Sequence, residues 1–234
     1  VEASIAKVAG SEVADFVLDE NIQIHGGNGF VKDYPAERHF RDARVNRIFE
    51  GTSEINRLLI PGMLMRRALK GDLPIIQAAK KLQDELMGPP QMGARPAAGV
   101  LGDEQHTVAS LKKVALAVMG VGMLRHGEKL ADEQEVMMSI ADILIDTYQA
   151  ESAVLRAIDA AARSLPRAAL QQDAAQVFVH DAAARVEVNA KQALAALADG
   201  DMLRTHLAAL RRLLKPVPVN TIALRRRLAD ATVA

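Results

Sequence analysis

The chain has 234 residues, of which half are hydrophobic and only 3% aromatic, with neither Cys nor Trp. Lys and Arg total 29, as do Asp and Glu, so charge favours neither nucleic acid nor an anionic membrane as a partner. The lack of Cys excludes disulfides, thiolate metal sites and cysteine nucleophiles and fits a reducing compartment, so we expect a cytoplasmic protein.

The first element is a helix from Val1 to about Gln23, because its apolar residues fall mostly at helical spacing. A glycine turn at residues 25–29 ends it. No capping residue precedes the helix and the chain begins with Val, so we expect a fragment or a processed chain. A short helix is predicted from Ala36 to Ala43, followed by a loop at Glu50–Gly51.

A second long helix is expected directly after this loop. Thr52 or Ser53 suits its N-cap, Glu54 in the first turn complements the helix dipole, and Pro61 is a potential kink. A shorter helix is predicted around Ile75 to Leu86. The segment 87–96 is rich in Gly and Pro and is the predicted linker.

Apolar residues then follow steps of three and four in four further segments, residues 108–122, 136–154, 173–198 and 203–214. Four helices with short connections predict an antiparallel bundle. The fold class is therefore all-α, with a first helical domain over 1–75, a connecting segment over 76–103 and a helical extension over 104–234. No apolar run reaches the roughly 18–20 residues that span a bilayer.

Two segments could carry chemistry. Residues 23–30 combine a side-chain amide with three glycines, which lets backbone N–H groups approach a phosphate, although for this segment by itself a plain glycine turn between two helices is the favoured explanation. Glu50 precedes a glycine and a helix N-terminus, where a carboxylate can reach into a pocket as a general base. An exposed acid near a helix start is the commoner explanation on physical grounds alone.

Four motifs in order change these odds: QIHGGNGF at 23–30, YPAER at 34–38, RDAR at 41–44 and IFEGTSEI at 48–55. Together they resemble the C-terminal signature of the acyl-CoA dehydrogenases. The continuation at 57–64 and the helical tail resemble the very-long-chain branch and its bacterial relatives. The resemblance implies the C-terminal helical domain of that family, followed by a second helical bundle.

The resemblance also implies a function: oxidation of a fatty acyl-CoA to a trans-2-enoyl-CoA, with Glu50 as the base that removes the α-proton. FAD is the implied cofactor, electron-transfer flavoprotein the implied electron acceptor, and a homodimer the implied assembly, because the glycine turn would contact FAD held by the neighbouring subunit. Gly51 would lie against the substrate. The implied FAD contacts are Gln23, Ile24, His25, Gly26, Gly27, Thr52 and Ser53.

The basic residues have two interpretations each. Arg38, Arg41 and Arg44 could clamp a CoA phosphate, but we favour Arg41 and Asp42 as structural ion pairs that hold the Glu50 loop. The basic end at 225–227 is interpreted as a solvated helix rather than a lipid contact, so peripheral membrane attachment has weak support. We predict no metal site, since no His, Asp and Glu set has ligand spacing.

Most of the flavin and substrate pocket is not encoded here, so the isolated chain is expected to be catalytically inactive. The competing hypothesis is a non-enzymatic helical module for dimerisation or partner docking, in which Glu50 is a surface acid. Acyl-chain preference, electron acceptor and oligomeric state do not follow from the residues themselves.

Overall fold

The computed structural model describes residues 1–88 and 99–233, which are almost entirely helical and contain no strand. This confirms the all-α prediction. The chain divides into two compact units, Val1–Leu69 and Lys70–Ala234, called here the first and second unit.

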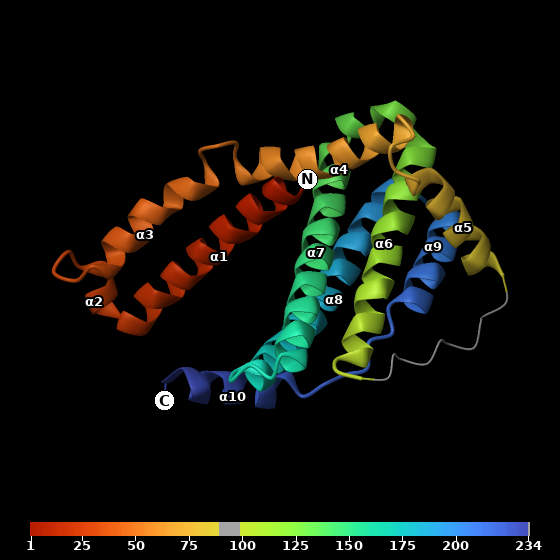
Figure 1. The fold of residues 1–234 in the computed structure, drawn as a ribbon. Coiled ribbons are helices and arrows are strands. Elements are labelled where there is room, and N and C mark those ends of the chain that lie inside the picture. The colour runs from red at the N-terminus through yellow and green to blue at the C-terminus, as the bar shows by residue number, and fades with distance from the viewer. Residues whose placement is uncertain (89–98, 234) are drawn as a thin grey trace. The chain divides into compact units, whose positions relative to one another are not determined.

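The first unit is built on one long helix, α1 (Glu2–His25), which contacts the other helices of the unit (Figure 1). They are the short α2 (Gly27–Phe30), α3 (Ala36–Arg44), the 3₁₀ turn η1 (Val45–Arg47) and α4 (Ser53–Leu69). The predicted helices at 1–23 and 36–43, and the one after the loop, are thus confirmed.

The core of the first unit lies where the N-terminal half of α1 meets α4. Ile5 and Val8 of α1 and Ile60 and Met65 of α4 are at most 5% exposed. Burying such side chains stabilises by about 1.5–3 kcal/mol each. Pro61 is also buried, and α4 continues through it. The Phe49–Thr52 loop is therefore held between two elements that pack on the same helix.

The second unit begins with α5 (Ile75–Met87), and its centre is formed by α6 (Gly102–His126), α7 (Gln134–Ala162) and α8 (Ala168–Leu197), which contact one another. The turn η2 (Gly127–Asp132) joins α6 to α7, and a short connection joins α7 to α8, so neighbouring helices are antiparallel. α9 (Gly200–Leu213) packs on α8 and α6. The predicted bundle is confirmed, while residues 89–96 of the predicted linker lie outside the described residues.

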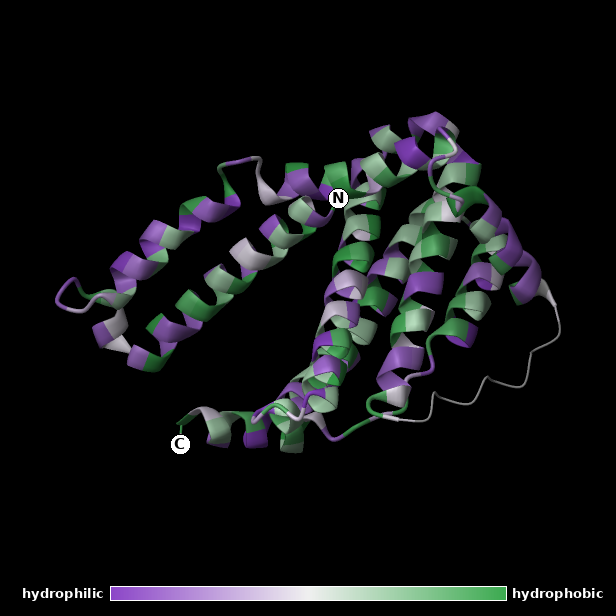
Figure 2. Ribbon diagram, viewed as in Figure 1, coloured by the Kyte–Doolittle hydropathy of each residue, from purple (hydrophilic) through white to green (hydrophobic). Residues whose placement is uncertain are grey.

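Hydrophobic and hydrophilic residues alternate along these helices (Figure 2), and the hydrophobic ones make the core. The interlocking side chains have essentially no exposed surface: Leu111 and Val118 of α6, Ile140 and Ile143 of α7, and Val179 and Val186 of α8.

Residues 102–132 form a helical stretch that is long and apolar enough, by length and composition, to cross a membrane. Half of its most apolar window is buried inside the protein, and α6 contacts both α7 and α8. A core helix of a bundle passes the same test, so this stretch is assigned to the core.

Two sets of ion pairs join α8 to its neighbours α7 and α10. Arg185 on α8 donates to both carboxylate oxygens of Asp146 on α7, at 2.6 and 3.1 Å, and lies over the Phe178 ring. On α10 (Thr221–Val233), Arg225 pairs with Asp181 and Arg227 with Asp173, both on α8. The basic end at 225–227 is exposed, as predicted for a solvated helix, and two of its arginines also pair with α8.

His206 on α9 is partly buried, and burial lowers its pKa below the ordinary value of 6.5. The folded state then binds fewer protons than the unfolded state as the pH falls through 6.5, so stability should decrease from pH 7.5 to pH 5.5. In His206→Gln the imidazole that causes this pH dependence is absent, and the decrease in stability should be smaller. Urea unfolding followed by circular dichroism at both pH values measures the difference. An equal decrease in both proteins would contradict the assignment.

Candidate functional site

The predicted base lies in a loop with an unusual backbone. Between η1 and α4, Glu50 has φ +56° and Gly51 has φ +80°, so two successive residues occupy the left-handed region. For a residue with a Cβ this conformation costs roughly 1–2 kcal/mol, which surrounding contacts must offset. The Glu50 side chain is exposed. The loop therefore exposes a carboxylate on a backbone whose conformation is intrinsically unfavourable.

A buried amide holds this loop from inside. Asn56, in the second turn of α4, is 7% exposed, and its Nδ2 donates to the carbonyl oxygens of Gly51 at 2.9 Å and Thr52 at 3.2 Å. The Glu50 carbonyl oxygen lies 3.5 Å from the same nitrogen. Sequence reasoning missed Asn56, although a buried Asn inside an apolar helix face is itself a signal of a specific hydrogen-bonding role.

The middle of α1 holds both flanks of the loop. Before the loop, Arg47 donates to Asp15 at 2.9 Å; after it, Arg57 donates to both carboxylate oxygens of Glu12, at 2.6 and 2.8 Å. Arg47 also lies 3.8 Å from Glu12. These side chains are 14–31% exposed, so the pairs are less screened than surface ones.

The predicted anchoring by Arg41 and Asp42 is wrong in its residues. Both are exposed on α3, and in the described part of the chain neither lies within 4.0 Å of an opposite charge. The loop is instead flanked by the pairs of Arg47 and Arg57, because these residues stand at the two ends of the loop and face α1. Arg38 and Arg44 are also exposed, which leaves the interpretation of a phosphate clamp untested.

Thr52 is the N-cap of α4, as predicted, since its Oγ1 accepts a hydrogen bond from the Ile55 N–H at 3.2 Å. Glu54 follows in the first turn. Its pKa lies below the ordinary value, first because of a hydrogen bond from its own backbone N–H, with Thr52, Arg47 and Arg57 adding to the effect. The start of α4 is thus an ordered, charged helix N-terminus beside the loop.

Ser53 differs from the other predicted cofactor contacts, because its side chain is fully buried. Its Oγ lies 3.4 Å from the Oγ of Ser11 on α1. In this arrangement Ser53 joins α4 to α1, and neither its side chain nor its backbone has exposed surface in this structure.

The glycine turn lies at the C-terminal end of α1. The side chains of its first residues are exposed, Ile24 by 82%, and His25 donates from Nδ1 to the Asn21 carbonyl oxygen at 2.8 Å. Gly29 is buried, and a Cβ there would lie 2.5 Å from the Ile22 carbonyl oxygen, so only glycine lets the chain return against α1. The exposed candidate residues are Gln23, Ile24, His25, Gly26 and Gly27.

The two groups of predicted FAD contacts lie beside different parts of α1. The Glu50 loop is anchored at residues 11–15, and the glycine turn begins at Gln23. At 1.5 Å per residue the separation along the helix is roughly 12–18 Å. The two groups therefore cannot contact the same small part of a ligand.

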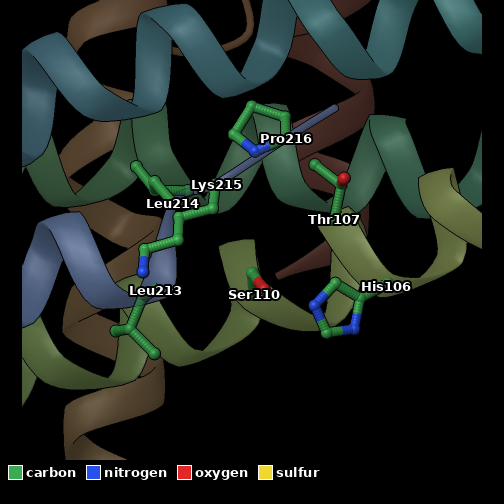
Figure 3. A pocket seen from close by; sticks show the side chains of 7 residues that line it. All are labelled: His106, Thr107, Ser110, Leu213, Leu214, Lys215 and Pro216. Atoms are coloured by element: carbon green, nitrogen blue, oxygen red, sulfur yellow. The ribbon is translucent and has the colours of Figure 1, made fainter. Parts of the chain in front are cut away.

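The hollow shown in Figure 3 belongs to the second unit and not to this loop. Residues His106, Thr107 and Ser110 of α6 line it together with 213–216 at the end of α9. Its volume of about 10 Å³ holds about one water molecule. Among the described residues no group of three His, Asp or Glu is arranged to hold a metal ion.

Two family models, each described as "Acyl-CoA dehydrogenase, C-terminal domain", match residues 1–64 and 110–212. The chain belongs to the C-terminal domain family of the acyl-CoA dehydrogenases. A probable acyl-CoA dehydrogenase of Bacillus subtilis (strain 168) is 44% identical over 98% of this chain and 38% of its own length. A crystal structure of an acyl-CoA dehydrogenase complexed with FAD from Bacillus anthracis has a TM-score of 0.92 at 43% identity, covering 99% of this chain and 39% of that one.

This acyl-CoA dehydrogenase C-terminal chain thus spans less than two fifths of those relatives. Other relatives match a shorter stretch, about 28% of this chain. The human mitochondrial short-chain specific acyl-CoA dehydrogenase is 57% identical over 65 residues, and the caffeyl-CoA reductase-Etf complex subunit CarC of Acetobacterium woodii is 46% identical over 66.

Gly51→Ala should destabilise the 234-residue chain by about 1–2 kcal/mol, because alanine is strained at this φ and its Cβ would lie 3.0 Å from the Asn56 amide. Gly10→Ala is the matched control. It lies in the interior of α1 with nothing within 4 Å of the added Cβ, and should stabilise by about 0.5–1 kcal/mol. Urea unfolding measures both, and similar effects at the two sites would refute the loop geometry.

Proposed function

We propose that the chain supplies the catalytic base, Glu50, and part of the FAD site of a longer enzyme that oxidises fatty acyl-CoA to trans-2-enoyl-CoA. The observation that carries the proposal is the Glu50 loop itself. Its carboxylate is exposed, its backbone is left-handed at two successive positions, and both flanks are tied to α1. A fixed and outward carboxylate is what abstraction of a weakly acidic proton requires.

The proton and electron balance follows from the substrate. Glu50 takes the proton from Cα of the acyl thioester, and the Cα–H electrons form the new double bond as the β-hydrogen leaves with its electron pair. FAD, when bound, supplies the acceptor for that hydride. Negative charge that develops on the thioester oxygen needs donors fixed in advance, for which the backbone N–H groups of this ordered loop are suited. Gly51, without a side chain, would leave room for the acyl chain beside Glu50.

The residues of the chain fit FAD at two places. Gly26 and Gly27 have nothing within 4 Å of a Cβ position, so a ligand can reach the backbone there, and the Gln23 amide and His25 ring are exposed beside them. At the second place, the start of α4 offers the Thr52 hydroxyl, which can still donate to a phosphate or ribose while its oxygen accepts from the Ile55 N–H.

The two places are roughly 12–18 Å apart along α1, so they can contact different parts of one cofactor or the cofactors of two subunits. We propose the second arrangement, which requires a homodimer. Electron-transfer flavoprotein is the proposed acceptor, in line with the Etf complex named for one relative. The very-long-chain branch remains our proposed class, since the 230-residue match includes the bundle whereas the short-chain match ends after 65 residues. We propose a cytoplasmic location, with membrane attachment at most peripheral.

A specific observation also favours the interaction module. α1 exposes the large apolar side chains of Val13, Phe16, Val17 and Ile24 at helical spacing. A stripe of this kind marks a surface that something covers. Since the chain spans 38% of its relative, the remainder of a longer enzyme is one occupant, and in the module hypothesis the occupant is another protein.

In the full-length gene product, Glu50→Gln should retain bound flavin and lose about 10²–10⁴-fold in acyl-CoA turnover, because the amide cannot accept the α-proton. Asp42→Asn, at an exposed acid of α3, is the matched control and should leave the rate unchanged. Flavin absorbance and turnover with octanoyl- and palmitoyl-CoA measure both. Absence of flavin, or an undiminished rate in Glu50→Gln, would favour the interaction module.

The 234-residue chain alone should show no turnover with either acyl-CoA, even with added FAD. The base then lacks the parts of the pocket that place Cα beside it. Adding the remaining segment of the enzyme as a separate chain should restore activity if the two associate. Turnover by the isolated chain would contradict this expectation.

A further inference from the structure

We infer that Asn56 is a positioning residue for Glu50: its buried amide fixes the backbone of residues 50–52 and thereby the direction of the catalytic carboxylate. The inference rests on the proposed function and adds to it a residue that touches neither substrate nor cofactor. It stands on the three contacts between Nδ2 and the loop carbonyls.

The orientation of the amide follows from its surroundings. Three carbonyl oxygens lie within 3.5 Å of the same atom, and an oxygen at that position would face three acceptors without a donor. The amide nitrogen must therefore point into the loop. Its two N–H groups serve the Gly51 and Thr52 carbonyls, at 2.9 and 3.2 Å, and the Glu50 carbonyl shares them at 3.5 Å.

These contacts fix the peptide planes as well as the carbonyls. In a trans peptide the N–H points opposite to the C=O. With the carbonyls of residues 50 and 51 turned toward Asn56, the N–H groups of Gly51 and Thr52 point away from it. The same contacts restrain the Glu50 backbone at φ +56°, so the amide offsets the strain of a non-glycine residue in the left-handed region.

Asn56 also explains why residue 51 is glycine. A Cβ at Gly51 would lie 3.0 Å from Nδ2, closer than ordinary contacts allow, in addition to the strain at φ +80°. Gly51 and Asn56 therefore depend on each other, because the absence of a side chain at residue 51 lets the Asn56 amide approach the backbone. Substitutions at the two positions should not be additive.

An ordinary structural role is the alternative, since the Asn56 backbone N–H also makes a helix bond to the Thr52 carbonyl at 3.0 Å. That bond survives any side-chain replacement. A purely structural amide would, when lost, reduce the amount of folded, flavin-loaded enzyme. A positioning amide would instead lower the rate of proton abstraction in enzyme that is folded and loaded.

The test uses the full-length, flavin-loaded enzyme with three substitutions. Asn56→Leu keeps the size without the donors, Asn56→Asp keeps the shape with acceptors toward the loop, and Asn56→Gln keeps the donor group. Asn56→Leu and Asn56→Asp should lower kcat about 10- to 100-fold and raise the α-deuterium isotope effect on kcat, with KM for the acyl-CoA and flavin content within about threefold of wild type. Asn56→Gln should retain kcat within about threefold.

Unchanged kcat in the Leu and Asp variants, or a loss that simply follows flavin content, would overturn the inference. A second readout does not depend on activity. In the 234-residue chain, the shift of the urea midpoint by Gly51→Ala should be smaller in an Asn56→Ala background, because the amide that the new Cβ meets is gone. Equal shifts in both backgrounds would overturn the coupling, whereas coupling without any effect of Glu50→Gln on turnover would sink the proposed function alone.

Discussion

One turn of α1 determines where the Glu50 loop can be. Glu12 and Asp15 each pair with an arginine on one side of the loop, and Ser11 contacts Ser53 where α4 begins. The pairs are only partly exposed, and the bidentate Arg57–Glu12 geometry adds direction to attraction. Because η1 and α4 approach α1 through these contacts, the loop between them spans a fixed gap. The left-handed backbone at residues 50 and 51 follows from that span together with the Asn56 amide.

The first unit combines a buried apolar core with an exposed carboxylate. The buried apolar side chains of Ile5, Val8 and Ile60 exclude water and fix the position of α4 on α1. The carboxylate of Glu50, by contrast, is exposed. The second unit has its own core and its own ion pairs, and it is present in the Bacillus relatives that match nearly the whole chain.

The sequence predicted the helices well because periodicity reports burial: the patterns at 108–122 and 136–154 correspond to the buried faces of α6 and α7. It predicted Thr52 as a cap and Glu50 as a loop residue for local reasons. It could not choose which arginines pair with α1, because Arg41 and Arg47 look alike until the chain is folded. Asn56 was missed for a related reason, since its partners are main-chain atoms that carry no sequence signal.

The proposed role of Glu50 can be tested by a structure of the full-length enzyme with FAD and a bound non-reactive acyl-CoA. We expect a Glu50 carboxylate oxygen about 3–3.5 Å from Cα of the acyl chain, with Nδ2 of Asn56 still on the loop carbonyls. A different acid beside Cα, or a Glu50 carboxylate directed into solvent while the thioester is bound, would contradict it.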